Sequence, residues 1–192
     1  HKRSRYAYVC VISNEKYLEG AVNMAWTIRK HSKLVQDNNA DMVVMLNELL
    51  HDNSVMMLSA VGWNYVKVMK TMAYLSPKSY FTYTFDKLYL FGMIEYERVM
   101  FFDADMLIIH NPDGVFETEL PSEKHVGALG SEGSLYFQTG TMLIQPSRTV
   151  FEELFMEYKY GSFNYNQWRA RDGILCRNYF QSRHVNIGGT SG

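Results

Sequence analysis

Asp103 and Asp105 are two carboxylates one residue apart, and their type and spacing suggest metal chemistry. They follow an apolar run, residues 99–102, that predicts a buried strand. Alternate residues of a strand point to the same face, so the two charges are expected to lie side by side and repel each other. A divalent cation would relieve that repulsion and bridge the pair to a diphosphate, and Mg²⁺ and Mn²⁺ suit such oxygen ligands. The alternative is a solvent-facing turn at the strand end.

The segments around this pair alternate between strand and helix patterns. Continuous β-prone runs at residues 6–12, 42–46 and 65–68 predict strands, and residues 18–31 repeat apolar side chains on one helical face after the polar cap residues 13–15. This alternation predicts an α/β fold with a mostly parallel central sheet flanked by helices. Such sheets bind ligands at the carboxyl ends of their strands, which favours the segment after the first strand and the Asp103–Asp105 segment.

Further elements are expected along the rest of the chain. Strands are predicted around residues 126–129 and 141–145, and a turn at residues 111–114. Helices are predicted at residues 85–91, at 148–158, from about 172, and after a cap at Asn53 or Ser54. Residues 161–171 are expected to form a surface loop. No repeat or linker interrupts the pattern, so residues 1–192 are expected to form one domain.

Composition excludes several classes of protein. The 192 residues carry a net charge of -1, which gives no bulk electrostatic case for nucleic acid as a partner. The two cysteines, Cys10 and Cys176, form no CxxC pair, which argues against a zinc site. No apolar run reaches the roughly 20 residues that span a bilayer, and no leader pattern is present. These features favour a cytoplasmic location, with a Golgi-lumenal catalytic domain of a longer protein as the alternative.

Four blocks of the sequence, in order, resemble glycosyltransferase family 8, which includes glycogenin and the plant glycogenin-like glucuronosyltransferases. The block around the two carboxylates covers residues 97–107 and continues through Asn111-Pro112-Asp113-Gly114. The other blocks are residues 11–17 followed by Gly20-Ala21, residues 85–88, and residues 137–147. The likeness covers nearly the whole chain. It implies a GT-A-like fold with a nucleotide-binding half at about 5–110 and a sugar and acceptor half at about 111–192.

The resemblance also implies site residues. Asp103 and Asp105 would hold the metal and, with Ala104, the donor, whereas Lys87 would contact the donor and act in catalysis. The residues implied for the nucleoside are Val11, Ser13, Asn14 and Tyr17, with Tyr17 on the uracil ring, and those implied for the sugar are Gln138, Thr139 and Gly140.

Structural alternatives accompany these assignments. Asn14 could be a helix N-cap, Tyr17 a core residue, and Gly140 a turn residue. Lys87 could simply extend to solvent, as helical lysines often do. Lys78, nine positions earlier, lies where relatives often carry an arginine for phosphate, and its role is the weaker hypothesis.

Two departures from the family pattern affect the catalytic assignment. Relatives carry D-Q-G near the start of the last helix, whereas this chain has Arg171-Asp172-Gly173. An ungapped match places Arg171 on the carboxylate position, and a one-residue gap gives that role to Asp172, which could also be an N-cap. The family's closing H-x-x-G-x-x-K-P-W segment is absent, and His184 lies too early to replace it. The expectation is therefore either a truncated chain or a cation held by two carboxylates, water and donor.

The resemblance implies a retaining transferase that uses Mn²⁺ or Mg²⁺ to move a hexose or hexuronate from a UDP-sugar to a hydroxyl acceptor, which could be a carbohydrate, a protein or a lipid-linked group. The alternatives are a catalytically impaired UDP-sugar-binding relic and a sugar nucleotidyltransferase. The second lacks support, because residues 13–16 are not a Gly- and basic-rich phosphate loop. The sequence leaves the oligomeric state open, a homodimer included.

Overall fold

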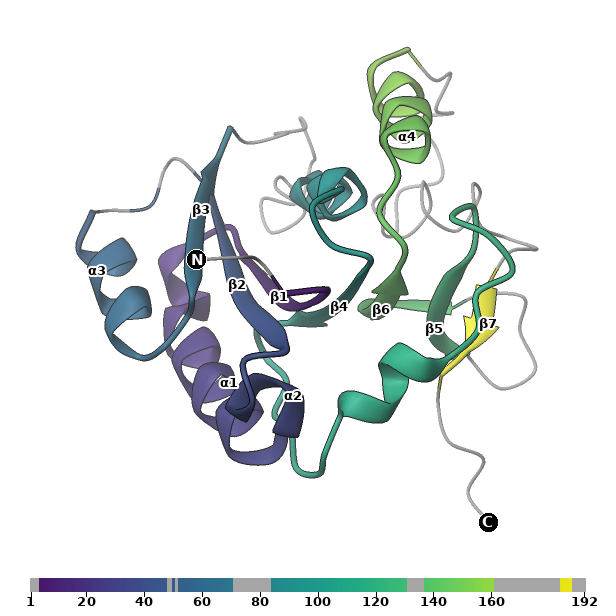
Figure 1. Ribbon diagram of the computed structural model, residues 1–192. Helices are drawn as coiled ribbons and strands as arrows, with labels where there is room; N and C mark the ends of the chain where they lie inside the picture. The colour runs from purple at the N-terminus through teal and green to yellow at the C-terminus, as the bar shows by residue number, and fades with distance from the viewer. Residues whose placement is uncertain are drawn as a thin grey trace.

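The computed structural model describes residues 4–47, 50, 52–70, 84–130, 137–160 and 184–187. Within them, one sheet has the strand order β3-β2-β1-β4-β6-β5-β7 (Figure 1). The strands are β1 (Tyr6–Ile12), β2 (Ala40–Asn47), β3 (Tyr65–Met69), β4 (Arg98–Asp103), β5 (Val126–Gly130), β6 (Phe137–Ile144) and β7 (His184–Asn186). Only β6 runs against its neighbours in this described sheet, so the predicted mostly parallel sheet is confirmed.

Helices cover both faces of the sheet. They are α1 (Leu18–His31), α2 (Lys33–Gln36), α3 (Asp52–Ala60) and α4 (Arg148–Tyr160), with 3₁₀ helices η1 (Glu15–Tyr17), η3 (Thr84–Gly92) and η4 (Asp113–Glu117). One apolar core joins the sheet to η3 and α4, and the other joins it to α1 and α3. Figure 1 shows α1 and α3 apart from α4 across the sheet. None of the helices in the described ranges is long and apolar enough to cross a bilayer.

Burial of strand β1 on both faces explains why its sequence is continuously apolar. Ala7 and Val9 belong to the core under η3 and α4, whereas Tyr8 and Cys10 belong to the core under α1, and all four side chains are fully buried. A strand with helices on both faces has no solvent side, so polar alternation disappears. Strand β4 lies next to β1 in parallel register and follows the same rule through Phe102.

Element boundaries differ from the sequence prediction where tertiary pairing decides them. Strand β6 begins at Phe137, four residues before the predicted start, because Phe137 and Gln138 pair with β5 beyond a bulge. The predicted helix at residues 85–91 is confirmed, as the 3₁₀ helix η3. The predicted cap at Asn53 or Ser54 is wrong, since α3 already includes Asp52.

Two short elements were not predicted, and two predicted ones lie outside the residues that the structure describes. Helix α2 and strand β7 were not predicted, because three or four residues are too few to show a period. The predicted loop at 161–171 and the helix from Asp172 lie outside the described residues. The division of the domain into a nucleotide-binding half and a sugar half stays a prediction.

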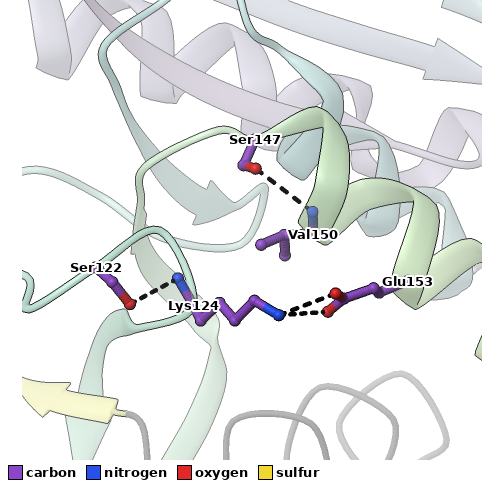
Figure 2. A network of polar contacts seen from close by, with 5 residues as sticks. All are labelled: Ser122, Lys124, Ser147, Val150 and Glu153. Atoms are coloured by element: carbon purple, nitrogen blue, oxygen red, sulfur yellow. Dashed lines mark hydrogen bonds and ion pairs between the residues drawn. The ribbon is translucent and has the colours of Figure 1, made fainter.

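Polar contacts fasten α4 to its surroundings (Figure 2). The ammonium of Lys124 lies 2.9 and 3.1 Å from the two carboxylate oxygens of Glu153, and the Ser122 hydroxyl accepts a hydrogen bond from the Lys124 amide at 3.2 Å. The Ser147 hydroxyl accepts from the Val150 amide at 3.4 Å, as an N-cap does. The Lys124–Glu153 pair thus joins α4 to the segment before β5, and Ser147 caps the start of the helix.

Candidate functional site

The site residues lie at one edge of the sheet, where β1 and β4 end and β6 begins. Val11 of β1 lies opposite Asp103, the last residue of β4. Strand β6 is antiparallel to β4 and pairs Thr141 with Phe102, so Gly140 continues past the end of β4 beside Asp103. The sheet register therefore brings together the end of the first strand, the end of the strand that leads into the two carboxylates, and residues near the start of β6.

Asp103 is held by an ion pair with Lys87. The Lys87 ammonium lies 2.8 Å from Asp103 Oδ1, with side-chain exposures of 15% for the lysine and 35% for the aspartate. The same ammonium lies 5.2 Å from the centroid of the Phe101 ring, within the range of a cation–π contact. Lys87 therefore does not simply extend to solvent, as the structural alternative for it proposed.

Gly140 packs against the other oxygen of that carboxylate. A Cβ atom at this position would lie 2.9 Å from Asp103 Oδ2, closer than side chains normally approach. Gly140 is inside strand β6, so the alternative of a turn at Gly140 is wrong. Of the other residues implied for the sugar, Gln138 is exposed and Thr139 is half-buried, both on this strand.

Asp105 lies in a turn beyond the strand. Strand β4 ends at Asp103, and the Met106 amide donates a hydrogen bond to the Asp103 carbonyl at 3.2 Å. The strand-alternation reason for placing the carboxylates on one face is therefore wrong, and the turn decides the direction of Asp105. The Asp105 side chain is exposed and makes no hydrogen bond or ion pair with another residue in the described ranges.

The pKa of Cys10 is affected by charged groups near this edge of the sheet. Its thiol is fully buried on β1, and burial is the main reason that its pKa is raised. Asp103 and Asp105 raise the pKa of Cys10 further, and the Lys87 ammonium lowers it. The pKa of Cys10 thus depends on charges of both signs, of which Asp103 and Lys87 form an ion pair.

Gly20 brings α1 against the turn. A Cβ atom on Gly20 would lie 2.1 Å from the Ala104 carbonyl oxygen, a distance that real side chains do not reach. Further along the same helix, the Ile108 amide donates to Thr27 Oγ1 at 3.3 Å. The loop after the two carboxylates therefore runs along α1. Sequence reasoning did not assign this role to Gly20, although a glycine inside a helical pattern was an available signal.

We expect Gly20→Ala to destabilise the protein although alanine is the better helix former. The added methyl must push the Ala104 carbonyl away, and overpacking of this kind costs about 1–3 kcal/mol, more than the ~1 kcal/mol helix gain. Gly114→Ala is the control, because a Cβ there meets nothing within 4 Å. Chemical denaturation of both variants measures the difference, and equal stabilities would contradict the close contact.

The residues implied for the nucleoside follow β1. Val11, Ser13 and Asn14 are half-buried, and Tyr17 is 43% exposed. The Asn14 side chain accepts a hydrogen bond from the Lys16 amide at 3.0 Å and caps η1, so the capping alternative for Asn14 is confirmed. The alternative of Tyr17 as a core residue is wrong, which leaves its ring available to a ligand.

The structure leaves some predicted residues undescribed. Lys78, Arg171 and Asp172 lie outside the described residues, and so does the side chain of His184. Within the described ranges, no group of three or more His, Cys, Asp or Glu side chains gathers as a metal site. Asp103 and Asp105 supply two carboxylates of the type that hard cations prefer, so a cation there needs further ligands.

Solved structures with the same fold are glycosyltransferases. The galactosyltransferase LgtC matches with a TM-score of 0.71 and 14% identity, covering 94% of this chain and 72% of that one. The glycosyltransferase GlyE of Streptococcus pneumoniae matches with a TM-score of 0.68 and 16% identity, covering 96% of this chain and 45% of that one. At these identities the likeness shows the GT-A fold and no more.

Sequence relatives narrow the family, although no protein-family model matches the chain. The chain is 31% identical over 154 residues to UDP-glucuronate:xylan alpha-glucuronosyltransferase 2 of Arabidopsis thaliana, covering 77% of this chain and 23% of that protein. It is 28% identical over 163 residues to glycogenin of Komagataella phaffii, covering 77% of this chain and 37% of that protein. The chain thus spans about a quarter of the length of the plant relatives it matches. By its ordered motifs, its fold and these relatives, the chain belongs to glycosyltransferase family 8.

Proposed function

We propose that this chain forms the donor-binding part of a retaining glycosyltransferase that moves a hexose or hexuronate from a UDP-sugar to a hydroxyl acceptor. The observation that carries the proposal is the Lys87–Asp103 ion pair at the carboxyl end of β4, followed at once by the turn that carries Asp105, because open α/β sheets bind ligands at this edge. The relatives named for UDP-glucuronate and the glycogenin relative support the class of donor. The acceptor hydroxyl would belong to a carbohydrate, a protein or a lipid-linked group.

The two carboxylates, Asp103 and Asp105, fit Mn²⁺ or Mg²⁺ as a cofactor. Asp105 offers an exposed carboxylate and Asp103 a half-exposed one, both oxygen ligands of the kind these ions take. When bound, such an ion would neutralise charge that develops on the departing UDP. Gly140 lies beside Asp103 at a position where a Cβ atom would come within 2.9 Å of Oδ2, so a side chain there would crowd the carboxylate.

Residues of this chain would bind the base, the sugar and the diphosphate of the donor. Tyr17 would stack on the base, Val11, Ser13 and Asn14 would border the nucleoside, and Gln138 and Thr139 would contact the sugar. Lys87 supplies positive charge beside Asp103, where the diphosphate would lie. We propose Asp172 as the carboxylate that stabilises the electron-poor anomeric centre or positions the acceptor.

Incubation of the purified protein with several UDP-sugars and Mn²⁺, followed by measurement of UDP release, tests this function. Turnover that depends on Mn²⁺ is the expected result, and its loss in Asp172→Ala would support the role of that residue. Thermal stabilisation by UDP and Mn²⁺ without turnover of any donor would instead support the UDP-sugar-binding relic, which the altered Arg171-Asp172-Gly173 favours. Pyrophosphate consumption with a sugar phosphate as product would support the nucleotidyltransferase.

The location in the cell and the oligomeric state also remain predictions. Size-exclusion chromatography with light scattering would show whether the protein is a homodimer. Fractionation of the cells that make it would separate a cytoplasmic from a Golgi location.

A further inference from the structure

A polar cavity lies at the amino ends of β2 and β3, at the edge of the sheet opposite to Asp103. Its volume is about 380 Å³, which falls within the range of pockets that hold small ligands. The last turn of α1, helix α2 and the turn between α3 and β3 surround it. Its lining side chains are polar at four positions and apolar at two: Arg29, Gln36, Asn38 and Asn64, and Val35 and Met42.

The turn at Gly62, which also lines the cavity, holds the guanidinium of Arg29 in place. Gly62 has a φ of 105°, in the left-handed region that favours glycine. A Cβ atom at this position would collide with Arg29 Nη1, so the guanidinium packs against the bare backbone of the turn. This guanidinium makes no hydrogen bond or ion pair with another residue in the part of the chain that the structure describes. Its donors are therefore positioned at the cavity and available to a ligand.

Three carboxamides complete the polar lining, and hydrogen bonds within the protein fix what two of them can offer. Gln36 Nε2 donates to two carbonyls at the end of α1, at 2.9 and 3.2 Å, which leaves Oε1 as an acceptor. Asn64 Oδ1 accepts from the Met42 amide at 2.7 Å, which leaves Nδ2 as a donor. Asn38 adds an exposed carboxamide. The cavity therefore offers a cationic group together with neutral donors and acceptors.

These groups suit a small ligand that carries one carboxylate and several hydroxyl groups. Among the described residues that line the cavity, none is acidic and Arg29 alone is cationic, so a singly charged anion fits best. A guanidinium binds a planar carboxylate through two parallel hydrogen bonds. Hydroxyl groups both donate and accept hydrogen bonds, so they match the carboxamides.

We propose that this cavity binds a hydroxylated monocarboxylate, the chemical class that includes the uronic acids, with Arg29 on the carboxylate and Gln36 and Asn64 on the hydroxyl groups. The site is separate from the donor edge. Arg29 lies nine residues, or about 14 Å of helix, beyond Gly20, which is the residue of α1 that contacts Ala104. A ligand in the cavity would not occupy the donor site, so its binding does not depend on the proposed transfer reaction.

Titration of D-glucuronate into the ¹⁵N-labelled protein tests the site. Nuclear magnetic resonance would record the side-chain amides of Gln36 and Asn64 and the guanidinium of Arg29. We expect these signals to shift with a dissociation constant on the order of 1 mM, as suits a ligand of this size. D-Glucose lacks the carboxylate and should bind at least about tenfold more weakly, because the charge-assisted hydrogen bonds are lost. Shifts confined to residues 138–140 would place D-glucuronate at the donor edge and overturn the proposal.

Arg29→Gln should weaken the binding of D-glucuronate by at least about tenfold. The fold should persist because the side chain is exposed, and thermal melting verifies this. The matched control is Lys30→Gln. Lys30 is the next residue of the same helix and carries the same charge, but its ammonium lies 4.8 Å from the centroid of the Trp26 ring and does not line the cavity. Its change should leave the dissociation constant as it is.

Equal weakening in the two variants would overturn the site, because the effect would then be one of net charge. Tighter binding of inorganic phosphate than of D-glucuronate would overturn the ligand class. UDP binding with Mn²⁺ should be the same in Arg29→Gln as in the unaltered protein, so a failure of this site is distinguishable from a failure of the proposed function. An oligosaccharide with a terminal glucuronate separates the two sources of this chemistry: tighter binding than that of the free acid assigns the site to a glycan, and weaker binding assigns it to the free acid.

Discussion

Asp105→Asn is expected to abolish the Mn²⁺-dependent part of UDP binding and to leave the fold intact. The side chain is exposed, lies in the turn after β4 and makes no hydrogen bond or ion pair with a residue in the described ranges, so the fold loses nothing by the change. The amide has the same shape but no charge, and it is a much poorer ligand for a hard cation. We expect the affinity for UDP in the presence of Mn²⁺ to fall about 100-fold, or about 3 kcal/mol.

Titration calorimetry with UDP, with and without Mn²⁺, measures this effect. Asp37→Asn is the matched control, because Asp37 is an exposed aspartate at the end of α2, remote from the carboxylate turn. Asp103 is the less useful position for the experiment, since its change would also remove the contact between its carboxylate and the Lys87 ammonium. Unchanged UDP affinity in Asp105→Asn, with a normal melting curve, would count decisively against the metal site.

Asp113→Ala is expected to produce the largest loss of stability. One oxygen of Asp113 accepts hydrogen bonds from the Tyr8 hydroxyl at 2.7 Å and from the Ser32 hydroxyl at 2.5 Å. The other accepts from the backbone amides of Lys33 and Leu34, at 2.8 and 3.1 Å. These amides begin α2, so the carboxylate caps that helix from a distant part of the chain.

Alanine would leave all four donors without their acceptor. Tyr8 and Ser32 are fully buried, and each unsatisfied buried donor costs about 1–3 kcal/mol, so we expect the free energy of unfolding to fall by about 3 kcal/mol or more. Asp113→Asn keeps one carbonyl oxygen and should lose less. Burial is the main reason that the pKa of Tyr8 is raised, and burial does not depend on the Asp113 carboxylate, so the tyrosine cannot relieve the loss by ionising at neutral pH.

Urea unfolding of Asp113→Ala, Asp113→Asn and the unaltered protein measures this series. Glu97→Gln is the control: its carboxylate pairs with Arg5 at 2.6 Å, but both side chains are exposed and surface pairs of this kind stabilise little. Equal stability of Asp113→Ala and Glu97→Gln would show that the four contacts contribute no more than a surface ion pair.

Much of the fold could be predicted from the sequence because its signals are local. The run at residues 6–12 is apolar at every position, and the structure buries both faces of β1 between helices. The boundaries that were missed depend on partners: Phe137 and Gln138, at the start of β6, pair with β5 across a bulge. A period of two residues for a strand, or of about 3.6 for a helix, can be recognised within one segment. The pairing of two strands depends on both segments and cannot be recognised in either alone.

The sequence by itself determined that two carboxylates follow a buried strand of a parallel sheet, and this alone points to the carboxyl edge where such sheets bind ligands. The tertiary structure decided how the pair is used: Lys87 meets Asp103 across 16 positions, Gly20 meets Ala104 across 84, and the strand ends before Asp105. It also made the half-buried carboxylate of Asp113, in the predicted turn at residues 111–114, a cap for α2. The reason is physical, because local sequence fixes periodicity and faces, while contacts between distant segments depend on how helices and strands pack against one another.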